Sequence, residues 1–556
     1  MGIVNMRIPF FTSHECEYNQ CIFVRVVETL MYSFLLFIPC LISIATILDK
    51  LVTYVNNYPL QYKLIFILLA LELLGVTMFS CAWTADKERC HRNTSNYLVV
   101  SICIAAFFAR ILAAFILNGV PENDFLSVYQ AAIDPESKAS MISGVYYYGV
   151  YAAVLRVAMN LLGNTTAFVG MLINALCTSL IPAFLYYAVR KFSGSEFPAI
   201  TAASFYAFFP SMILFSVCLA GENISQLFIA VAFWALAHAW AAEQEQNVPA
   251  FWKYLLLSCV SFGFVNLFKP IQQIIIIVIV VEEIVYRIIP ALVQGVRTKS
   301  VQKILAPCLT TIAFLSCLLI SNISVYSAGE LFVKSIFGIE FQEGYYGVST
   351  FPEIAFFGLK QEGGGIWNAE VKELQENILG NSANLQEAHK EMLTQLAEEI
   401  ENDPKAFFNL LYRKIQISWS DEWAYGYYAS VPEQGYTSPN DTTSGYFALT
   451  VLPRAYIGLL YTLTAIGFLI RIFSRPNEWR REEGLVLMFF GLFTLIFLIM
   501  EAHTRYKSTF MPLLCILAAL GLFDLKNVTD SISSRYHLWI TKKMRQSNIS
   551  REAVRC

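Results

Sequence analysis

The sequence predicts an all-α protein that crosses a membrane many times. Of its 556 residues, 56% are hydrophobic and only 15% are charged, and the mean hydropathy is +0.52. Soluble domains are about 45–50% apolar and about 25% charged. About twelve apolar runs follow one another, each suited to cross a ~30 Å hydrocarbon core as a helix that rises 1.5 Å per residue. A soluble protein is therefore excluded.

The predicted spans are taken in the order in which the apolar runs occur. They cover residues 30–48, 64–83, 97–117, 167–189, 198–217, 225–240, 252–267, 271–288, 304–325, 456–472, 485–500 and 508–525. The first run is too long for a signal peptide and has no small-residue cleavage site, so we expect it to be a span.

The distribution of Lys and Arg orients these spans. Because basic residues concentrate in cytoplasmic loops, we expect both ends of the chain to be cytoplasmic. The net charge is −3 and no basic stripe is evident, so no nucleic-acid partner is expected. The basic groups assigned to the inside are Arg7, Arg25, Lys87, Arg89, Arg92, Arg190, Lys191, Arg287, Arg297, Lys299, Lys303, Arg471, Arg475, Arg480, Arg481 and the tail from Lys526 to Arg555.

This threading divides the chain into six segments. They are the N-terminal spans (1–117), a first outer loop with interfacial helices (118–166), a transmembrane core (167–325), an extracytoplasmic domain (326–450), C-terminal spans (451–525) and a basic cytoplasmic tail (526–556).

The extracytoplasmic domain is predicted to be small and mostly helical. Apolar residues recur at helical spacing from Leu385 to Ile400, and Asp403-Pro404 is a typical helix start for the segment that follows. Three consecutive glycines, 363–365, suggest a mobile loop beside these helices.

Thirteen cysteines raise the question of disulfides or a metal site. The long polar stretch from 328 to 450 contains none of them, and most of the others lie inside apolar runs. Disulfides are therefore not expected. Cys16 and Cys21 near His14 match no zinc spacing well.

Charged residues beside the membrane gather at the predicted outer ends. Glu122 and Asp124 follow the third span, and a carboxylate held among apolar neighbours tends to have a raised pKa, which suits a general base. Solvated loop charges are the alternative. Further outer charges are Glu222, Lys269 before Pro270, Glu501, His503 and Arg505, with Tyr506 adjoining them. Basic groups at headgroup level suit a lipid phosphate, although single charges often only anchor helix ends.

Two charges lie inside predicted spans. Glu72 in the second span and Arg110 in the third fall at similar depths, so we expect a structural ion pair between them.

Four segments resemble a known family. Asn123-Asp124-Phe125 with Tyr129 resembles an acidic first-loop motif, Phe209-Pro210-Ser211 through Glu222 a reentrant hairpin, Phe268-Lys269-Pro270 a basic-Pro element, and Glu501 to Pro512 a late motif. The outer segment with Gly363 to Gly365, Lys414 and Trp419 is similar as well. The chain thus resembles bacterial GT-C membrane glycosyltransferases of family 39, the protein O-mannosyltransferase and aminoarabinose transferase superfamily. The family's two adjacent acidic residues are split here by Asn123, which leaves Asp124 the better match.

The resemblance implies a hexosyltransferase that moves a sugar from a polyprenyl-phosphate lipid to an acceptor hydroxyl at the outer face, with inversion. The acceptor would be a cell-envelope polymer, a glycolipid or a protein. Asp124, with Glu122 beside it, would act as base, while Lys269 and Arg505 would bind the donor phosphate. Glu222, Glu501, His503 and Tyr506 would orient these groups or bind the sugar, and Trp367, Trp419, Trp423 and Tyr427 offer flat faces. No cofactor is certain; a divalent metal is compatible with the superfamily.

Two other classes remain open. A lipid or envelope-precursor transporter also needs many spans, but no repeat relates the two halves of the chain. An envelope polymerase or acyltransferase would share the outward-facing chemistry.

Overall fold

The computed structural model describes residues 33–57, 92–117, 119–341, 351–422, 425, 447–474 and 481–553. Every regular element in these ranges is a helix, which confirms the predicted all-α class. The first half contains η1 (Ser33–Phe37), α3 (Ile38–Asn57), α5 (Arg92–Leu117), α6 (Asn123–Ile133), α7 (Ala139–Gly144), α8 (Tyr146–Leu162), α9 (Phe168–Ser193), α10 (Glu196–Ala207), α11 (Pro210–Phe215), α12 (Glu222–Gln244) and α13 (Val248–Phe268).

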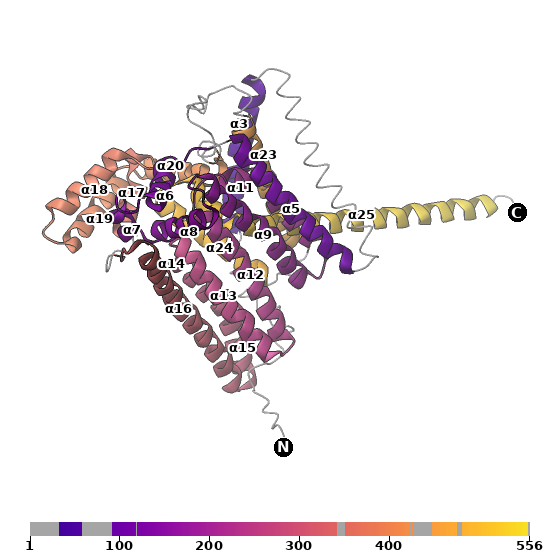
Figure 1. Cartoon of the computed structure of the whole chain (residues 1–556). Coiled ribbons are helices and arrows are strands. Elements are labelled where there is room, and N and C mark those ends of the chain that lie inside the picture. The colour runs from indigo at the N-terminus through magenta and orange to yellow at the C-terminus, as the bar shows by residue number, and fades with distance from the viewer. Residues whose placement is uncertain are drawn as a thin grey trace.

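The second half continues the same pattern. Its helices are α14 (Gln272–Glu283), η2 (Ile284–Ile288), α15 (Ile289–Thr298), α16 (Gln302–Phe337), α17 (Phe351–Leu359), η3 (Gln361–Gly363), α18 (Ala369–Asn381), α19 (Leu385–Asn402), α20 (Pro404–Ile415), η4 (Gln416–Ser420), η6 (Phe447–Val451), α23 (Leu452–Ser474), α24 (Arg481–Ile499), η7 (Thr504–Phe510) and α25 (Met511–Ala553). In Figure 1, α25 leaves the bundle as one long helix that leads to the C-terminus.

Eight helices in the described ranges are long and apolar enough to cross a membrane. They coincide with eight of the twelve predicted spans. The first predicted span overlaps η1 and α3, while the second, 64–83, lies outside the described residues. The chain is a multi-pass membrane protein.

The fifth predicted span is built differently from the prediction. Residues 198–217 do not form one continuous helix, because α10 ends at Ala207 and Pro210 begins the separate short helix α11. The eighth run is helical, because α14 is followed directly by the π-helical segment η2, and α15 continues the same helix to Thr298. Apolar composition alone does not distinguish a broken helix from a continuous one.

Arg110 is fully buried in the bundle and binds backbone carbonyls. Its Nη1 donates to the carbonyl oxygens of Ala106 at 3.0 Å and Ala207 at 3.1 Å, and its guanidinium lies 5.6 Å from the centre of the Tyr206 ring. Ala207 ends α10, where the helix dipole is negative and carbonyls lack helical partners. Arg110 therefore caps the C-terminus of α10. The predicted partner Glu72 lies outside the described residues.

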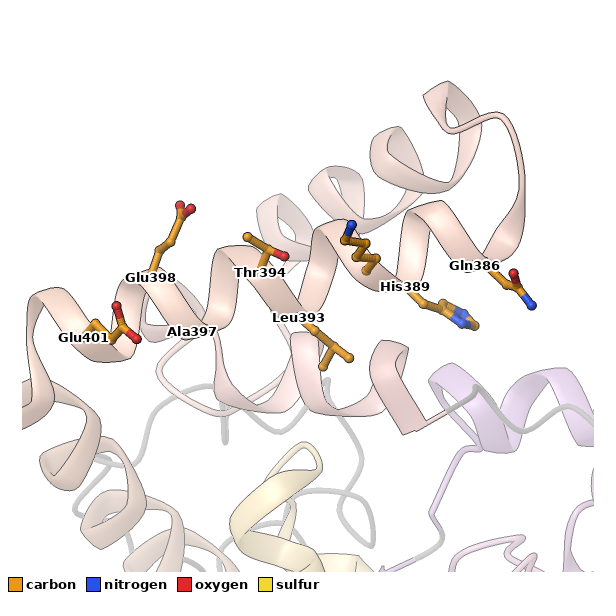
Figure 2. A pocket seen from close by; sticks show the side chains of 8 residues that line it. Gln386, His389, Leu393, Thr394, Ala397, Glu398 and Glu401 are labelled. Atoms are coloured by element: carbon orange, nitrogen blue, oxygen red, sulfur yellow. The ribbon is translucent and has the colours of Figure 1, made fainter.

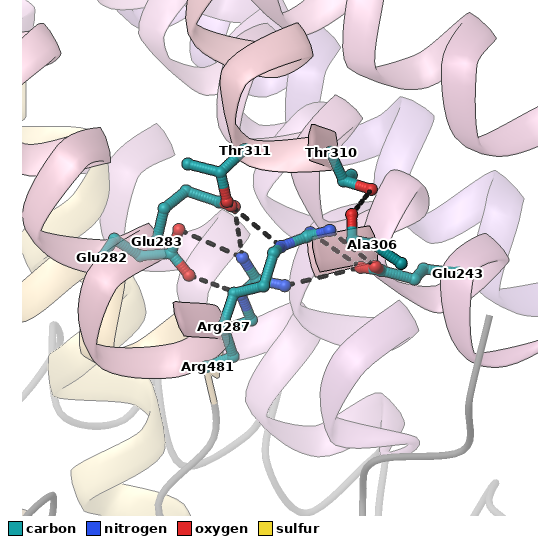
Figure 3. Close-up of polar contacts among 8 residues, drawn as sticks. All are labelled: Glu243, Glu282, Glu283, Arg287, Ala306, Thr310, Thr311 and Arg481. Carbon is teal, nitrogen blue, oxygen red and sulfur yellow. Dashed lines mark hydrogen bonds and ion pairs between the residues drawn. The ribbon is translucent and has the colours of Figure 1, made fainter. Parts of the chain in front are cut away.

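A second group of buried charges lies where the end of α12, the end of α14 and the start of α24 meet (Figure 3). Arg481 at the start of α24 forms ion pairs with Glu282 and with Glu283, the latter at 2.6 Å, and both carboxylates are fully buried. Arg287 binds Glu283 and Glu243, each at 2.8 Å. Arg287 and Arg481 are two of the basic groups that we assigned to the cytoplasmic side. We refer to Glu243, Glu282, Glu283, Arg287 and Arg481 as the inner ion cluster.

Helices α17, α18 and α19 gather at one side of the molecule and form a separate small core (Figure 1). The predicted helix at 385–400 is α19, whose Ala388, Met392 and Leu396 are buried against α17 and α18. Asp403 caps α20 as expected, because its side chain accepts a hydrogen bond from the Ala406 amide at 2.9 Å.

The triple glycine is held against the bundle. Gly364 and Gly365 have φ values of +58° and +77°, which L side chains rarely adopt. The Gly365 carbonyl accepts a hydrogen bond from the Ala502 amide at 2.7 Å. This loop therefore connects α17, α18 and α19, which we call the outer helices, to the turn between α24 and η7.

Candidate active site

The predicted site residues come from four places in the chain that meet at one end of the spans. Asp124 lies in the first turn of α6, Glu222 begins α12, Lys269 follows the end of α13, and Arg505 lies in the 3-10 helix η7. Helices α6 and α8 pack on each other, and η7 packs on α12. Ser225 and Thr509 hydroxyls, 3.1 Å apart, tie α12 to η7.

Asp124 is bound by two donors on one oxygen. Arg505 Nη2 donates to its Oδ2 at 2.6 Å, and the Tyr148 hydroxyl donates to the same oxygen at 3.0 Å. Burial alone would raise the pKa of Asp124, but the charge and hydrogen bond of Arg505 and the Tyr148 hydrogen bond outweigh burial, so this pKa lies below its ordinary value. The expectation of a raised pKa is therefore wrong, because Asp124 has a cationic partner, Arg505, and a hydroxyl donor, Tyr148, whose effects together exceed that of burial.

Lys269 pairs with Glu222. The Lys269 Nζ lies 2.9 Å from Glu222 Oε1, and only 13% and 11% of these two side chains are exposed. The pair joins the end of α13 to the start of α12. A buried charge is stable only when it is paired in this way.

The ring of Tyr506 connects the two cations. Lys269 Nζ lies 4.6 Å from the ring centre, and the Arg505 guanidinium lies 5.7 Å from it. The negative face of an aromatic ring attracts cations at such distances. Two positive groups, each paired with its own carboxylate, therefore meet at a single aromatic side chain.

Glu501 and His503 complete the turn that leads into η7. The Tyr506 hydroxyl donates to the Glu501 carboxylate, whose pKa burial raises despite the nearby Arg505. His503 Nδ1 accepts a hydrogen bond from the Arg505 amide at 3.2 Å, and its ring lies 5.3 Å from that of Tyr506. Burial and then the cations Arg505 and Lys269 lower the pKa of His503 to about 3. His503 is thus neutral and holds the Arg505 backbone.

A buried ion pair that the sequence analysis missed anchors η7. Lys507 Nζ lies 2.5 Å from Glu422 Oε1 with both side chains fully buried, and it also donates to the Trp419 carbonyl at 3.0 Å. The Tyr425 hydroxyl donates to the Thr504 carbonyl at 3.1 Å. The signal was present in the sequence as a second basic residue two positions after Arg505.

Several predicted roles find no support in these contacts. Glu122 provides the backbone carbonyl that begins α6, and no ion pair of its side chain occurs in the described residues. Trp419 is buried against Phe490 and Phe497 and packs the core, while Trp367 is 63% exposed. Trp423 and Tyr427 lie outside the described residues. Within the described ranges, no group of three or more His, Cys, Asp or Glu side chains is arranged to hold a metal ion.

A shallow groove runs along the surface of α19, which carries none of the predicted site residues. Figure 2 shows that its lining side chains, among them Gln386, His389, Leu393 and Glu401, all come from this one helix. His389 pairs with Glu353 of α17 at 3.1 Å, so its imidazole stabilises the outer helices. None of the predicted site residues lines this groove.

Comparison with known proteins supports the resemblance. Residues 150–326, which include Glu222 and Lys269, match the family model described as dolichyl-phosphate-mannose-protein mannosyltransferase. The predicted resemblance to the GT-C membrane glycosyltransferases is thereby confirmed.

The solved structures that match this chain include the archaeal oligosaccharyltransferase AglB from Archaeoglobus fulgidus, in complex with an inhibitory peptide and a dolichol-phosphate, with 12% identity and a TM-score of 0.42. The alignment covers 79% of this chain and 52% of AglB, so the chain spans about half the length of that protein. A comparison with curated proteins gives no match.

Proposed function

We propose that this protein is a glycosyltransferase that moves a sugar from a polyprenyl-phosphate carrier to an acceptor hydroxyl, with Asp124 as the base. The observation that carries the proposal is the meeting of Lys269 and Arg505 at the Tyr506 ring, with Arg505 bonded to Asp124 at 2.6 Å. The matched family is named for a dolichyl-phosphate-linked donor and a protein acceptor, which supports the same class of donor here.

The position of this cluster along the spans supports chemistry at the outer face. Helix α12 carries Glu222 at its first residue and Glu243, a member of the inner ion cluster, near its last. These residues are separated by about 32 Å at 1.5 Å per residue, close to the thickness of a hydrocarbon core. Since the inner ion cluster holds the predicted cytoplasmic arginines, the site belongs on the opposite, extracytoplasmic side.

The proposed reaction is one displacement at the anomeric carbon. The acceptor hydroxyl loses its proton to the Asp124 carboxylate while its oxygen forms a bond to that carbon. The bond to the phosphate oxygen breaks on the opposite side, so the configuration inverts. The electron pair stays on the leaving phosphate, where Lys269 and Arg505 stabilise the added negative charge.

Donor binding would also prepare the base. The donor phosphodiester offers Arg505 two free oxygens that share one negative charge and match the guanidinium fork, so it competes with Asp124 for the guanidinium. Once Arg505 turns to the phosphate, the Asp124 carboxylate loses its strongest partner and becomes a better proton acceptor. The depressed pKa of the resting enzyme thus fits a base that is released only when the donor is present.

The test is transfer by the purified full-length chain in liposomes, with radiolabelled polyprenyl-phosphate hexoses and envelope-derived acceptors. We expect Asp124→Asn to lower the rate about 10²–10⁴-fold, the usual contribution of a general base, while Glu122→Gln stays close to wild type. Equal rates for Asp124→Asn and wild type would overturn the proposal. The outward orientation is checked separately by labelling Glu136→Cys in intact cells with an impermeant thiol reagent, and protection of this exposed position would contradict it.

A further inference from the structure

Lys414 in α20 is a fully buried lysine outside the proposed reacting groups. Its side chain has no exposed area, and its Nζ donates to the Gly358 carbonyl at 2.5 Å. Burial lowers the pKa of Lys414 to about 7, and Glu501 is the charged group that opposes this effect. An apolar residue of similar size would avoid the cost of burying a charge. We therefore expect the amino group of Lys414 to have a specific role at this position.

The backbone around Lys414 touches the turn that carries Glu501. A Cβ added to Gly365 would lie 2.6 Å from Lys414 Cγ, so the glycine lets the lysine side chain pass. A Cβ added to Gly358 would lie 2.1 Å from the Ile499 carbonyl oxygen and 2.8 Å from the Glu501 amide nitrogen. These close approaches and the hydrogen bond from the Ala502 amide to the Gly365 carbonyl show that the outer helices pack tightly against the turn.

Electrostatic interactions connect Lys414 and Glu501 to the proposed site. Burial favours the neutral form of Glu501, whereas the charges of Arg505 and Lys414 favour its carboxylate. The Glu501 carboxylate accepts the Tyr506 hydroxyl, and the ring of Tyr506 lies against both Lys269 and Arg505. The charge of Lys414 thus acts on Glu501, and contacts run from Glu501 through Tyr506 to the two cations.

We infer that Lys414 is a positioning residue that acts through Glu501: its charge keeps the Glu501 carboxylate in place to orient Tyr506, and through Tyr506 the cations that receive the donor phosphate. The inference rests on the proposed function for its effect on the rate. The link between Lys414 and Glu501 does not depend on that function.

The test compares Lys414→Gln, which keeps a hydrogen-bond donor for Gly358 but loses the charge, with Lys414→Met, which loses both. The matched control is Lys405→Met, at an exposed position on the same helix. We expect both Lys414 variants to lose at least about tenfold in kcat/KM, equivalent to about 1.4 kcal/mol, and Lys405→Met to lose nothing. Wild-type kinetics for Lys414→Gln would overturn the inference.

A double-mutant cycle with Glu501→Gln separates positioning from a general loss of structure. If Lys414 acts through Glu501, Lys414→Gln has little further effect on kcat/KM once Glu501 is Gln, and the two melting-temperature losses are not additive. Additive losses in both measurements would refute the connection. Because melting is measured without substrate, coupled stabilities in a protein that transfers no sugar would reject the proposed function while keeping the link between Lys414 and Glu501.

Discussion

Arg505 Nη2 lies 2.6 Å from Asp124 Oδ2, although 381 residues separate them in the chain. This ion pair brings the start of α6 and the 3-10 helix η7 into a single group of charges. Because Tyr148 donates to the same oxygen, Oδ2 is fully engaged, and a proton from a substrate would be accepted most readily by Oδ1.

The Tyr148 hydroxyl helps to keep Asp124 ionised, so Tyr148→Phe should shift the acid limb of the kcat/KM pH profile to higher pH. The shift has this sign because a donor to the carboxylate favours its charged form. We expect the rate at pH 7 to fall by only about 3–10-fold, the usual value of one hydrogen bond. Tyr129→Phe is the control, since its hydroxyl donates to the Thr165 carbonyl instead. An unmoved acid limb would count against this role.

His503 should make the protein sensitive to acid. Its pKa is about 3 in the folded protein and about 6.5 in the unfolded chain, so the unfolded chain binds the extra proton between these values. Stability from His503 is complete above about pH 6.5 and falls as the pH decreases towards 3. His503→Asn, which retains a side-chain acceptor for the Arg505 amide, should reduce the drop in melting temperature between pH 7.5 and pH 5. An identical drop in both proteins would contradict the prediction.

Removing Arg481 should leave uncompensated carboxylates in the inner ion cluster. Arg481→Met is expected to destabilise the protein by about 3–5 kcal/mol, because Glu282 and Glu283 are fully buried. Adding Glu282→Gln should recover part of the loss, since one buried charge then disappears. Thermal unfolding in detergent measures both effects, with the exposed Arg297→Met as control. A melting temperature of Arg481→Met equal to that of Arg297→Met would show that the cluster contributes no stability.

Gly365 should tolerate substitution less well than another glycine with similar backbone geometry. Gly194 has φ +68° with no atom within 4 Å of an added Cβ, so Gly194→Ala should cost only the left-handed strain, about 1–2 kcal/mol. Gly365→Ala adds a clash with the Lys414 side chain at 2.6 Å. We expect a larger loss of melting temperature and a lower transfer rate for Gly365→Ala. Equal losses for the two variants would mean that the Lys414 side chain yields without consequence.

The sequence predicted the helices well where a single local rule applies. Eight spans and the helices at α6, α19 and α20 follow from hydropathy, period and capping residues, which act within a few turns of the chain. The break at Pro210 was missed, because a run of apolar residues looks the same whether or not its helix continues.

The membrane also allowed part of the site to be predicted. Because positive residues concentrate on the cytoplasmic side, Lys269 and Arg505 were recognisable as exceptions in the predicted threading, and the structure places them at the same aromatic ring. The partners of these site residues could not be predicted from the sequence. Tyr148, the Lys507 and Glu422 pair, and the contact of Lys414 with Gly358 depend on packing between distant segments.

The amino-acid sequence by itself determined where the apolar segments lie and approximately how far they extend, and it predicted a side of the membrane for each charge. These properties depend on transfer free energies that are summed along a continuous stretch of chain. Only the tertiary structure decided which charges pair, and hence that Asp124 meets Arg505 and has a lowered rather than a raised pKa. A pKa responds to groups within a few ångströms, and those neighbours come from segments that the fold alone brings together.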